Sequence, residues 1–255
     1  MKNCCTVSCL LFTAWMFFVS NANATLISAL GGQVVNDSDL NITWLADANL
    51  AATNVFGLER NVDLGMLPGI NTYSGSYIYN NGRMTWGGAM HWIAAMNNTN
   101  YLGYNDWRLP STTNVGNGCN YSTNGTNCGY NSIGSEMSHL HYVELSNKGY
   151  YNTAGLAQVG YGLVDDPVNP NDDNLFTYFQ PNYYWSGTEE PPYTGIVWFF
   201  EFNGGSQSLA GKSDNMYALA VRPGQVTAVP EPATTLLFIF GLLGLVKFAR
   251  KRIPS

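Results

Sequence analysis

Basic residues are scarce in the central part of this chain. Among its 255 residues, 11 are Lys or Arg and 17 are Asp or Glu, so charged residues make up only 11% of the composition. Five of the basic residues stand in the terminal segments, which leaves residues 25–229 with six basic and sixteen acidic side chains and a net charge of −10. A surface of that sign repels phosphate backbones, so we expect no nucleic-acid partner.

Cysteine and the usual nucleophile motifs are also sparse. Three of the five cysteines stand within the first nine residues, which leaves Cys119 and Cys128 in the rest of the chain. The sequence has no Gly-x-Ser-x-Gly elbow, so a Ser-His-Asp triad stays open but has no motif in its favour. We therefore predict no catalytic residue, no cofactor and no resident metal, and an enzyme is the less favoured class.

One run combines histidines with acids: His139 and His141 stand between Glu136 and Glu144. Residues two apart on an α-helix point about 200° away from each other, so the two histidines cannot share a ligand-binding face. We expect His139 to face Glu136 and His141 to face Glu144, each as a surface pair at i,i+3 spacing. Four loop acids could bind Ca²⁺ but are expected to be solvated: Asp165, Asp166, Asp172 and Asp173.

Long apolar runs occur only at the two ends. Lys2 precedes an apolar run at residues 10–19, and Ala22-Asn23-Ala24 has the small-x-small pattern of a signal peptidase site. Ten apolar residues are too few to cross a hydrocarbon core of ~30 Å. Residues 1–24 are therefore predicted to be a secretory signal peptide that is removed on export.

The other end, residues 226–255, combines three features in order. Pro230-Glu231-Pro232 precedes an apolar helix expected at residues 233–249, and Arg250-Lys251-Arg252 follows it. The basic cluster would stay in the cytoplasm, which places the preceding domain outside. The segment resembles the PEP-CTERM sorting signal, the alternative being an ordinary tail anchor. The resemblance implies processing by exosortase, transient anchoring in the inner membrane, and a final place at the cell surface or outside the cell.

Periodicity outlines the elements of the domain expected at residues 25–225. Residues 86–97 carry apolar side chains at helical spacing behind Thr85, an N-cap residue. Ile133, Met137 and Leu140 mark a second helix, and Asn203-Gly204 between two β-rich runs predicts a hairpin. The expected strands are residues 40–45, 183–187, 196–202, 207–210 and 216–221. The pattern indicates an α+β domain.

The segment at residues 101–111 is expected to organise the core. Trp107 and Leu109 alternate with polar neighbours, so a short extended segment would bury both on one face. Arg108 is expected to be ion-paired or stacked rather than to bind a substrate, as is Arg222. Two further tryptophans are assigned to the core: Trp185 and Trp198.

Five motifs that keep their order resemble the Lcl C-terminal domain family, a domain of unknown function. They are Trp86-x-x-Ala89, Gly103-Tyr-Asn-Asp-Trp-Arg-Leu-Pro110, Tyr184-Trp-Ser-Gly-Thr188, Val197-Trp-Phe-Phe-x-Phe-x-x-Gly204 and Ala220-Val-Arg-Pro223. The resemblance implies a C-type lectin-like fold, with two helices on a twisted antiparallel sheet and long loops. Related formylglycine-generating enzymes bind copper through a cysteine pair. Here Cys119 and Cys128 lie in a polar insertion of an exported chain, which favours a disulfide instead.

These features favour a non-enzymatic protein of the cell surface or extracellular matrix, whose lectin-like domain binds a surface glycan or a protein. A purely structural matrix component is one alternative, and a hydrolase or oxidase on the same fold is another. Gln180-Pro181-Asn182 resembles the calcium-ligating triplet of C-type lectins, but Trp198-Phe-Phe-Glu201 stands where their second motif would be. We therefore expect binding without calcium, with Tyr183 and Tyr184 or the tyrosines of residues 73–79 stacked on sugar faces, and with Gln180 and Asn182 nearby.

Overall fold

The computed structural model describes residues 26–70, 75–112, 128–163, 175–191 and 193–227. Seven short strands, two α-helices and four shorter helical turns alternate along these residues. In chain order they are β1 (Leu26–Ala29), η1 (Leu30–Gly32), β2 (Val34–Asp37), β3 (Ile42–Leu45), η2 (Leu50–Ala52), α1 (Trp86–Asn98), η3 (Tyr101–Gly103), α2 (Glu136–His139), η4 (Leu140–Glu144), β4 (Tyr183–Glu190), β5 (Tyr193–Glu201), β6 (Ser206–Gly211) and β7 (Val221–Pro223). The α+β class predicted from the sequence is confirmed.

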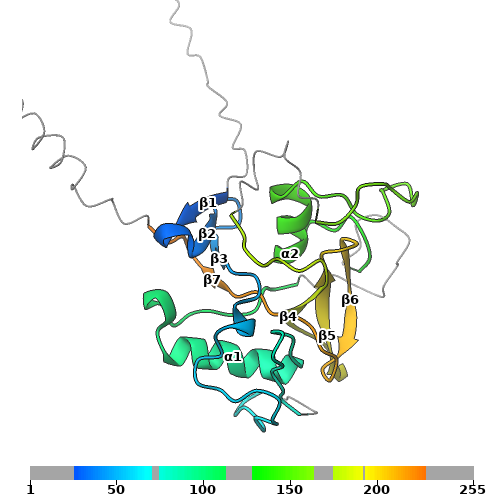
Figure 1. The fold of residues 1–255 in the computed structure, drawn as a ribbon. Helices are drawn as coiled ribbons and strands as arrows, with labels where there is room; N and C mark the ends of the chain where they lie inside the picture. The colour runs from blue at the N-terminus through cyan, green and yellow to red at the C-terminus, as the bar shows by residue number, and fades with distance from the viewer. Residues whose placement is uncertain (1–25, 71–74, 113–127, 164–174, 192, 228–255) are drawn as a thin grey trace, which may run out of the picture.

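The strands form two antiparallel sheets, so the expectation of a single sheet was wrong. One sheet has the order β1-β2-β3-β7 and the other the order β4-β5-β6. The reason is the path of residues 216–221, which were predicted to be one strand. Met216 bridges Met84 and Tyr217 bridges Tyr184, but only from Val221 does the chain pair with β3. This stretch therefore crosses from one sheet to the other (Figure 1).

Helix α1 matches its prediction closely. The Thr85 side chain accepts a hydrogen bond from the backbone N–H of Gly88 at 3.2 Å, which caps the first turn. The apolar stripe of the helix turns into the core, where Trp92 and Met96 are fully buried. Figure 1 shows α1 and α2 at opposite ends of the molecule in that view, with β3, β7 and β4 between them.

The second helix starts later than predicted and changes its winding. Ile133, assigned to its apolar stripe, lies before α2 and is 61% exposed, whereas Met137 and Leu140 are buried. From Leu140 the chain continues as the π-helical turn η4, in which the Leu145 N–H donates to the Leu140 carbonyl at 2.9 Å. A π-helical turn closes over five residues instead of four.

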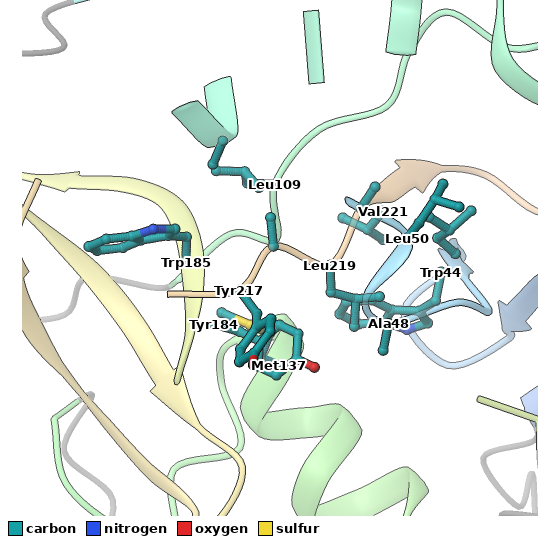
Figure 2. Packing of buried hydrophobic residues seen from close by; sticks show 14 of the residues in the cluster. Trp44, Ala48, Leu50, Leu109, Met137, Tyr184, Trp185, Tyr217, Leu219 and Val221 are labelled. Atoms are coloured by element: carbon teal, nitrogen blue, oxygen red, sulfur yellow. The ribbon is translucent and has the colours of Figure 1, made fainter. Parts of the chain in front are cut away.

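The core gathers residues from both sheets and both helices. Figure 2 shows Trp44, Ala48, Leu50, Leu219 and Val221 in the same cluster as Met137 of α2 and the Tyr184 and Tyr217 rings. The rings of Tyr184 and Tyr217 lie 5.5 Å apart between centroids. Trp185 and Trp198 are also buried.

The segment around Trp107 lies beside β7 without forming a full strand. Trp107 and Leu109 are 2% and 4% exposed, while Arg108 alone bridges Val221 through two backbone hydrogen bonds. The Arg108 guanidinium forms a bidentate pair with Glu136, at 2.6 and 2.7 Å, which ties this segment to α2.

Arg222 holds the start of the same segment. Its guanidinium binds both carboxylate oxygens of Asp106 at 2.8 and 2.9 Å and lies 3.9 Å above the Tyr104 ring. The positive charge is thus shared between an ion pair and an aromatic face. Both arginines serve packing, as their aromatic and aliphatic neighbours in the sequence indicate.

No helix in the described part of the chain is long and apolar enough to cross a membrane. The predicted signal peptide and the predicted apolar helix at residues 233–249 both lie outside the described residues.

Candidate functional site

A shallow cleft of about 400 Å³ opens beside the loop that leads into α1. We call it the Tyr79 cleft, and its lining residues are Tyr79, Asn80, Asn81, Arg83 and Asn215. Four of them belong to one tight turn, and the fifth comes from the segment between β6 and β7.

The turn is closed by backbone hydrogen bonds. The Tyr79 N–H donates to the Arg83 carbonyl at 2.8 Å, and the Gly82 N–H donates to the Tyr79 carbonyl at 3.0 Å. Gly82 has a φ of +86°, and a Cβ at this position would lie 2.0 Å from the Asn49 side-chain oxygen. Only glycine fits there, because the conformation is left-handed and the neighbouring chain approaches closely.

Arginine side chains anchor the cleft to the rest of the domain. Arg83 donates from Nε to the Asn215 carbonyl at 2.9 Å, and its Nη2 binds the same oxygen. On the other side, Arg60 donates to the carbonyls of Tyr79 at 2.9 Å and Ala51 at 2.6 Å. The turn is therefore held to Asn215 on one side and, through Arg60, to Ala51 on the other.

The ring of Tyr79 forms the aromatic wall of the cleft, and the neighbouring Tyr77 ring packs against it. The rings of Tyr77 and Tyr79 stack at 6.3 Å with planes 17° apart. The Tyr77 backbone exchanges hydrogen bonds with Thr85, the cap of α1. A Cβ on Gly88 would lie 2.2 Å from the Tyr77 carbonyl, so this glycine lets the loop lie directly against the helix.

The side chains of the Tyr79 cleft offer groups that suit the binding of a ligand. Its five lining residues offer one half-buried aromatic ring, amides and a guanidinium, and include no carboxylate, imidazole, hydroxymethyl or thiol group. An aromatic face with a few placed polar groups recognises a ligand that is itself both apolar and polar. The sequence predicted a tyrosine in this loop, but Arg83 and Asn215 were missed because they are 132 residues apart.

A second cavity, of about 360 Å³, lies between α1 and the Trp107 segment. Its lining residues are Met90, Ile93, Trp107, Arg108, Leu109, Ser111, Gly187 and Thr188. The charged side chain in this lining is Arg108, which is already hydrogen-bonded to Glu136. These hydrogen bonds raise the pKa of Arg108. This cavity is mostly apolar and offers little to a polar ligand.

The two tyrosines of β4 that were predicted to contact a ligand differ in burial. Tyr184 is fully buried, and its hydroxyl accepts a hydrogen bond from the Gln180 backbone at 2.9 Å, so its assignment as a stacking platform was wrong. The period-2 alternation fails here because β4 is covered on both faces from Tyr184 to Ser186. Tyr183 is 39% exposed and packs edge-on against Phe199.

The lectin-like triplet serves its own loop. The Gln180 side chain donates to the Tyr178 carbonyl at 2.7 Å, and the Asn182 side chain accepts from the Tyr183 N–H at 2.8 Å. Trp198, in the motif that would complete a lectin site, is buried and donates to Glu190. These hydrogen bonds explain why polar residues suit these positions without any ligand.

The two histidines do not form the predicted surface pairs. Glu136 binds Arg108 instead, and His141 is fully buried between the rings of Tyr142, Phe200 and Phe202. Burial lowers the pKa of His141 to about 4, and the nearby Lys148 backbone opposes part of this shift.

His139 faces Glu144 rather than Glu136. Its Nε2 lies 3.4 Å from a Glu144 carboxylate oxygen, and the Glu144 side chain is fully buried. Glu144 raises the pKa of His139 most, burial lowers it, and Asp37 and Asp39 raise it further. The α-helical geometry assumed from the sequence fails because η4 is a π-helical turn, which brings positions i and i+5 to one face.

Several predicted residues lie outside the described part of the chain. These are Cys119, the loop acids Asp165, Asp166, Asp172 and Asp173, and the sorting signal at residues 228–252. Cys128 is described and is 1% exposed.

Two family comparisons match this chain, and they cover different parts of it. The PEP-CTERM protein-sorting motif matches residues 228–252. This signal indicates export, transient membrane anchoring, processing by exosortase and a final place at the cell surface or outside the cell. No curated protein and no solved structure matches the chain. The Lcl C-terminal domain matches residues 33–222, which is most of the chain, and the protein therefore belongs to the Lcl C-terminal domain family.

Proposed function

We propose that this exported protein binds a surface glycan in the Tyr79 cleft and performs no chemistry on it. The observation that carries the proposal is the composition of that cleft: an aromatic ring, two exposed asparagines and an arginine on a rigid turn. A sugar ring has an apolar face that stacks on an aromatic side chain and hydroxyl groups that bind amides and guanidinium groups.

The affinity is expected to be weak. The cleft is shallow, so a sugar would keep much of its surface in water, and few polar groups would converge on it. We expect dissociation constants in the micromolar to millimolar range. Export through the PEP-CTERM route brings the domain to the compartment where surface polysaccharide is found, and many copies on one polymer would raise the effective affinity.

Calorimetry of the exported protein with the extracellular polysaccharide of the producing cell tests this function. Tyr79→Ala should weaken binding roughly tenfold, because it removes a stacking interaction of about 1.4 kcal/mol. Tyr193→Ala is the matched control, since Tyr193 is 62% exposed and lies outside the cleft. Added Ca²⁺ should leave the affinity unchanged.

Three outcomes of that experiment would contradict the proposal. An absence of heat with the wild-type protein would favour a structural matrix component. Equal losses for the two tyrosine variants would place the binding elsewhere. Turnover of the polysaccharide, seen as new reducing ends, would show an enzyme.

We also propose two features that belong to this function. The C-type lectin-like relationship is supported by the α+β composition and the long loops between short strands. A disulfide between Cys119 and Cys128 is supported by export and by the burial of Cys128.

Non-reducing peptide mapping of the exported protein should find Cys119 and Cys128 in one linked peptide pair. The bridge would close a short loop, and removing it should cost roughly 2–3 kcal/mol of stability. Labelling of two free thiols in protein from an oxidising compartment would refute the bridge.

A further inference from the structure

We propose that Asp37, His139 and Glu144 form a binding site for one divalent transition-metal ion, with Zn²⁺ as the best fit to the donor set. The site joins the end of β2 to α2 and η4. Figure 1 shows α2 at the opposite end of the molecule from α1 and the loop that leads into it, so this site is separate from the Tyr79 cleft.

The spacing of the side-chain atoms is the first argument. His139 Nε2 lies 3.4 Å from Glu144 Oε1, and one ligand atom from each of the three residues lies within 4.8 Å of the others. Two ligands held at ~2.1 Å from a tetrahedral ion stand roughly 3.4 Å apart. A direct hydrogen bond between charged groups would instead be about 2.7–2.9 Å long.

Unsatisfied buried atoms are the second argument. The Glu144 side chain is fully buried, and within the described chain neither of its carboxylate oxygens nor His139 Nε2 has a hydrogen-bond partner. An ionised carboxylate is strongly disfavoured in such a place unless its charge is compensated. A coordinated cation would satisfy all three atoms at once.

The acidic surroundings also suit a cation. Asp39 lies beside the site, with its Oδ2 3.5 Å from His139 Nε2, and it is 44% exposed. Three carboxyl groups therefore gather around one imidazole, which is a donor set that attracts a divalent ion. Asp39 or a water molecule can complete the coordination from the solvent side.

The ligands are held in place before any ion arrives. The Asp37 carboxylate accepts hydrogen bonds from the Leu40 N–H at 2.9 Å and from the Trp44 indole at 3.2 Å, one on each oxygen. Such outer contacts orient ligating carboxylates and leave their other lone pairs free. The π-helical turn η4 turns Glu144 toward His139, and π-helical turns occur often at functional sites.

The donor set selects the class of metal. One imidazole nitrogen with two or three carboxylates suits Zn²⁺ and its first-row neighbours, while Ca²⁺ and Mg²⁺ prefer sites made only of oxygen. We assign the ion a structural role, because it would connect the N-terminal sheet to the second helix.

The test uses the exported protein without a histidine tag, stripped with EDTA and returned to chelator-free buffer. Titration with Zn²⁺ should show one site per chain, and Zn²⁺ at a hundred times its dissociation constant should raise the Tm by roughly 5–10 °C. Equal concentrations of Ca²⁺ or Mg²⁺ should give no such shift. A wild-type protein without a Zn²⁺ site or a Tm shift would overturn the proposal.

Two matched variants locate the site. Glu144→Gln keeps the shape of the side chain and should lower the Zn²⁺ affinity by at least ~100-fold. Glu136→Gln is the control, because Glu136 lies in α2 with His139 but binds Arg108. Unchanged affinity in Glu144→Gln would refute the assignment, and His139→Gln replaces it should that variant not fold. Metal analysis of the wild-type protein after gel filtration in buffered Zn²⁺ gives an independent answer: one ion per chain is expected, and none would overturn the site.

Discussion

Trp107→Ala is expected to lower the free energy of unfolding by about 3–5 kcal/mol. The Trp107 ring is 2% exposed, and its indole N–H donates to the Tyr101 carbonyl at 3.1 Å. The backbone of the same residue exchanges hydrogen bonds with the Asn97 side chain at 2.8 and 2.9 Å. Removing the ring therefore leaves a large cavity and takes away one of the two donors to the Tyr101 carbonyl, the other being the Tyr104 N–H, in a segment that connects α1 to β7.

Denaturant titration of the exported protein measures this loss. Tyr193→Ala removes an aromatic ring that is 62% exposed, so it should change the stability by no more than ~0.5 kcal/mol. A loss below about 1 kcal/mol for Trp107→Ala would mean that the segment around Trp107 does not organise the core.

Local patterns in the sequence predicted the local elements well. Helix α1 follows from apolar spacing and the cap residue Thr85, and both signals lie within one stretch of chain. The hairpin of β5 and β6 follows from Asn203-Gly204 between two β-rich runs. Arg108 and Arg222 were each expected to be ion-paired or stacked because of their apolar neighbours. The sequence named neither of their partners, which are Glu136 for Arg108 and Asp106 for Arg222.

Features that depend on the assembled fold could not be predicted. The division into two sheets depends on where residues 216–221 cross, and each of these residues fits either a strand or a crossing. Tyr184 is buried because chain segments cover both faces of β4, which alternation in one strand does not reveal. The π-helical turn changes which residues share a face, so the pairing of His139 with Glu144 follows from the winding and not from the spacing alone.

In the candidate site too, the local turn could be predicted from the sequence, but its contacts across the fold could not. The Tyr79 turn is visible in the sequence as Asn80-Asn81-Gly82, a turn signal inside a tyrosine-rich loop. Its position against Asn215 is set by hydrogen bonds from Arg83 across the fold. Sequence patterns locate such loops, but only the packing decides which of them meet to form a cleft.

Lys212 gives the clearest case of a side chain whose role is invisible in the sequence, and its removal is the second large effect we expect. It stands in Gly211-Lys212-Ser213-Asp214, which resembles a solvated turn, yet its side chain is 1% exposed. Its ammonium group lies 2.8 Å from Glu189 Oε2 and 4.3 Å from the centre of the Trp86 ring. The side chain thus joins the end of β6 to β4 and to the first residue of α1.

Lys212→Ala should lower the free energy of unfolding by about 3–5 kcal/mol, because it removes a buried stem and breaks an ion pair whose lysine is buried. Lys212→Met keeps the length of the side chain without the charge, and Glu189 is 39% exposed and can be hydrated, so this variant should lose only about 1–2 kcal/mol. Lys148→Ala, at an exposed lysine, should change the stability by less than ~0.5 kcal/mol.

Denaturant titration of these variants separates the contribution of packing from that of charge. Equal losses for Lys212→Ala and Lys212→Met would show that the ion pair, and not the volume of the stem, holds these three elements together. A loss below about 1 kcal/mol for Lys212→Ala would contradict the contribution of this side chain to the core.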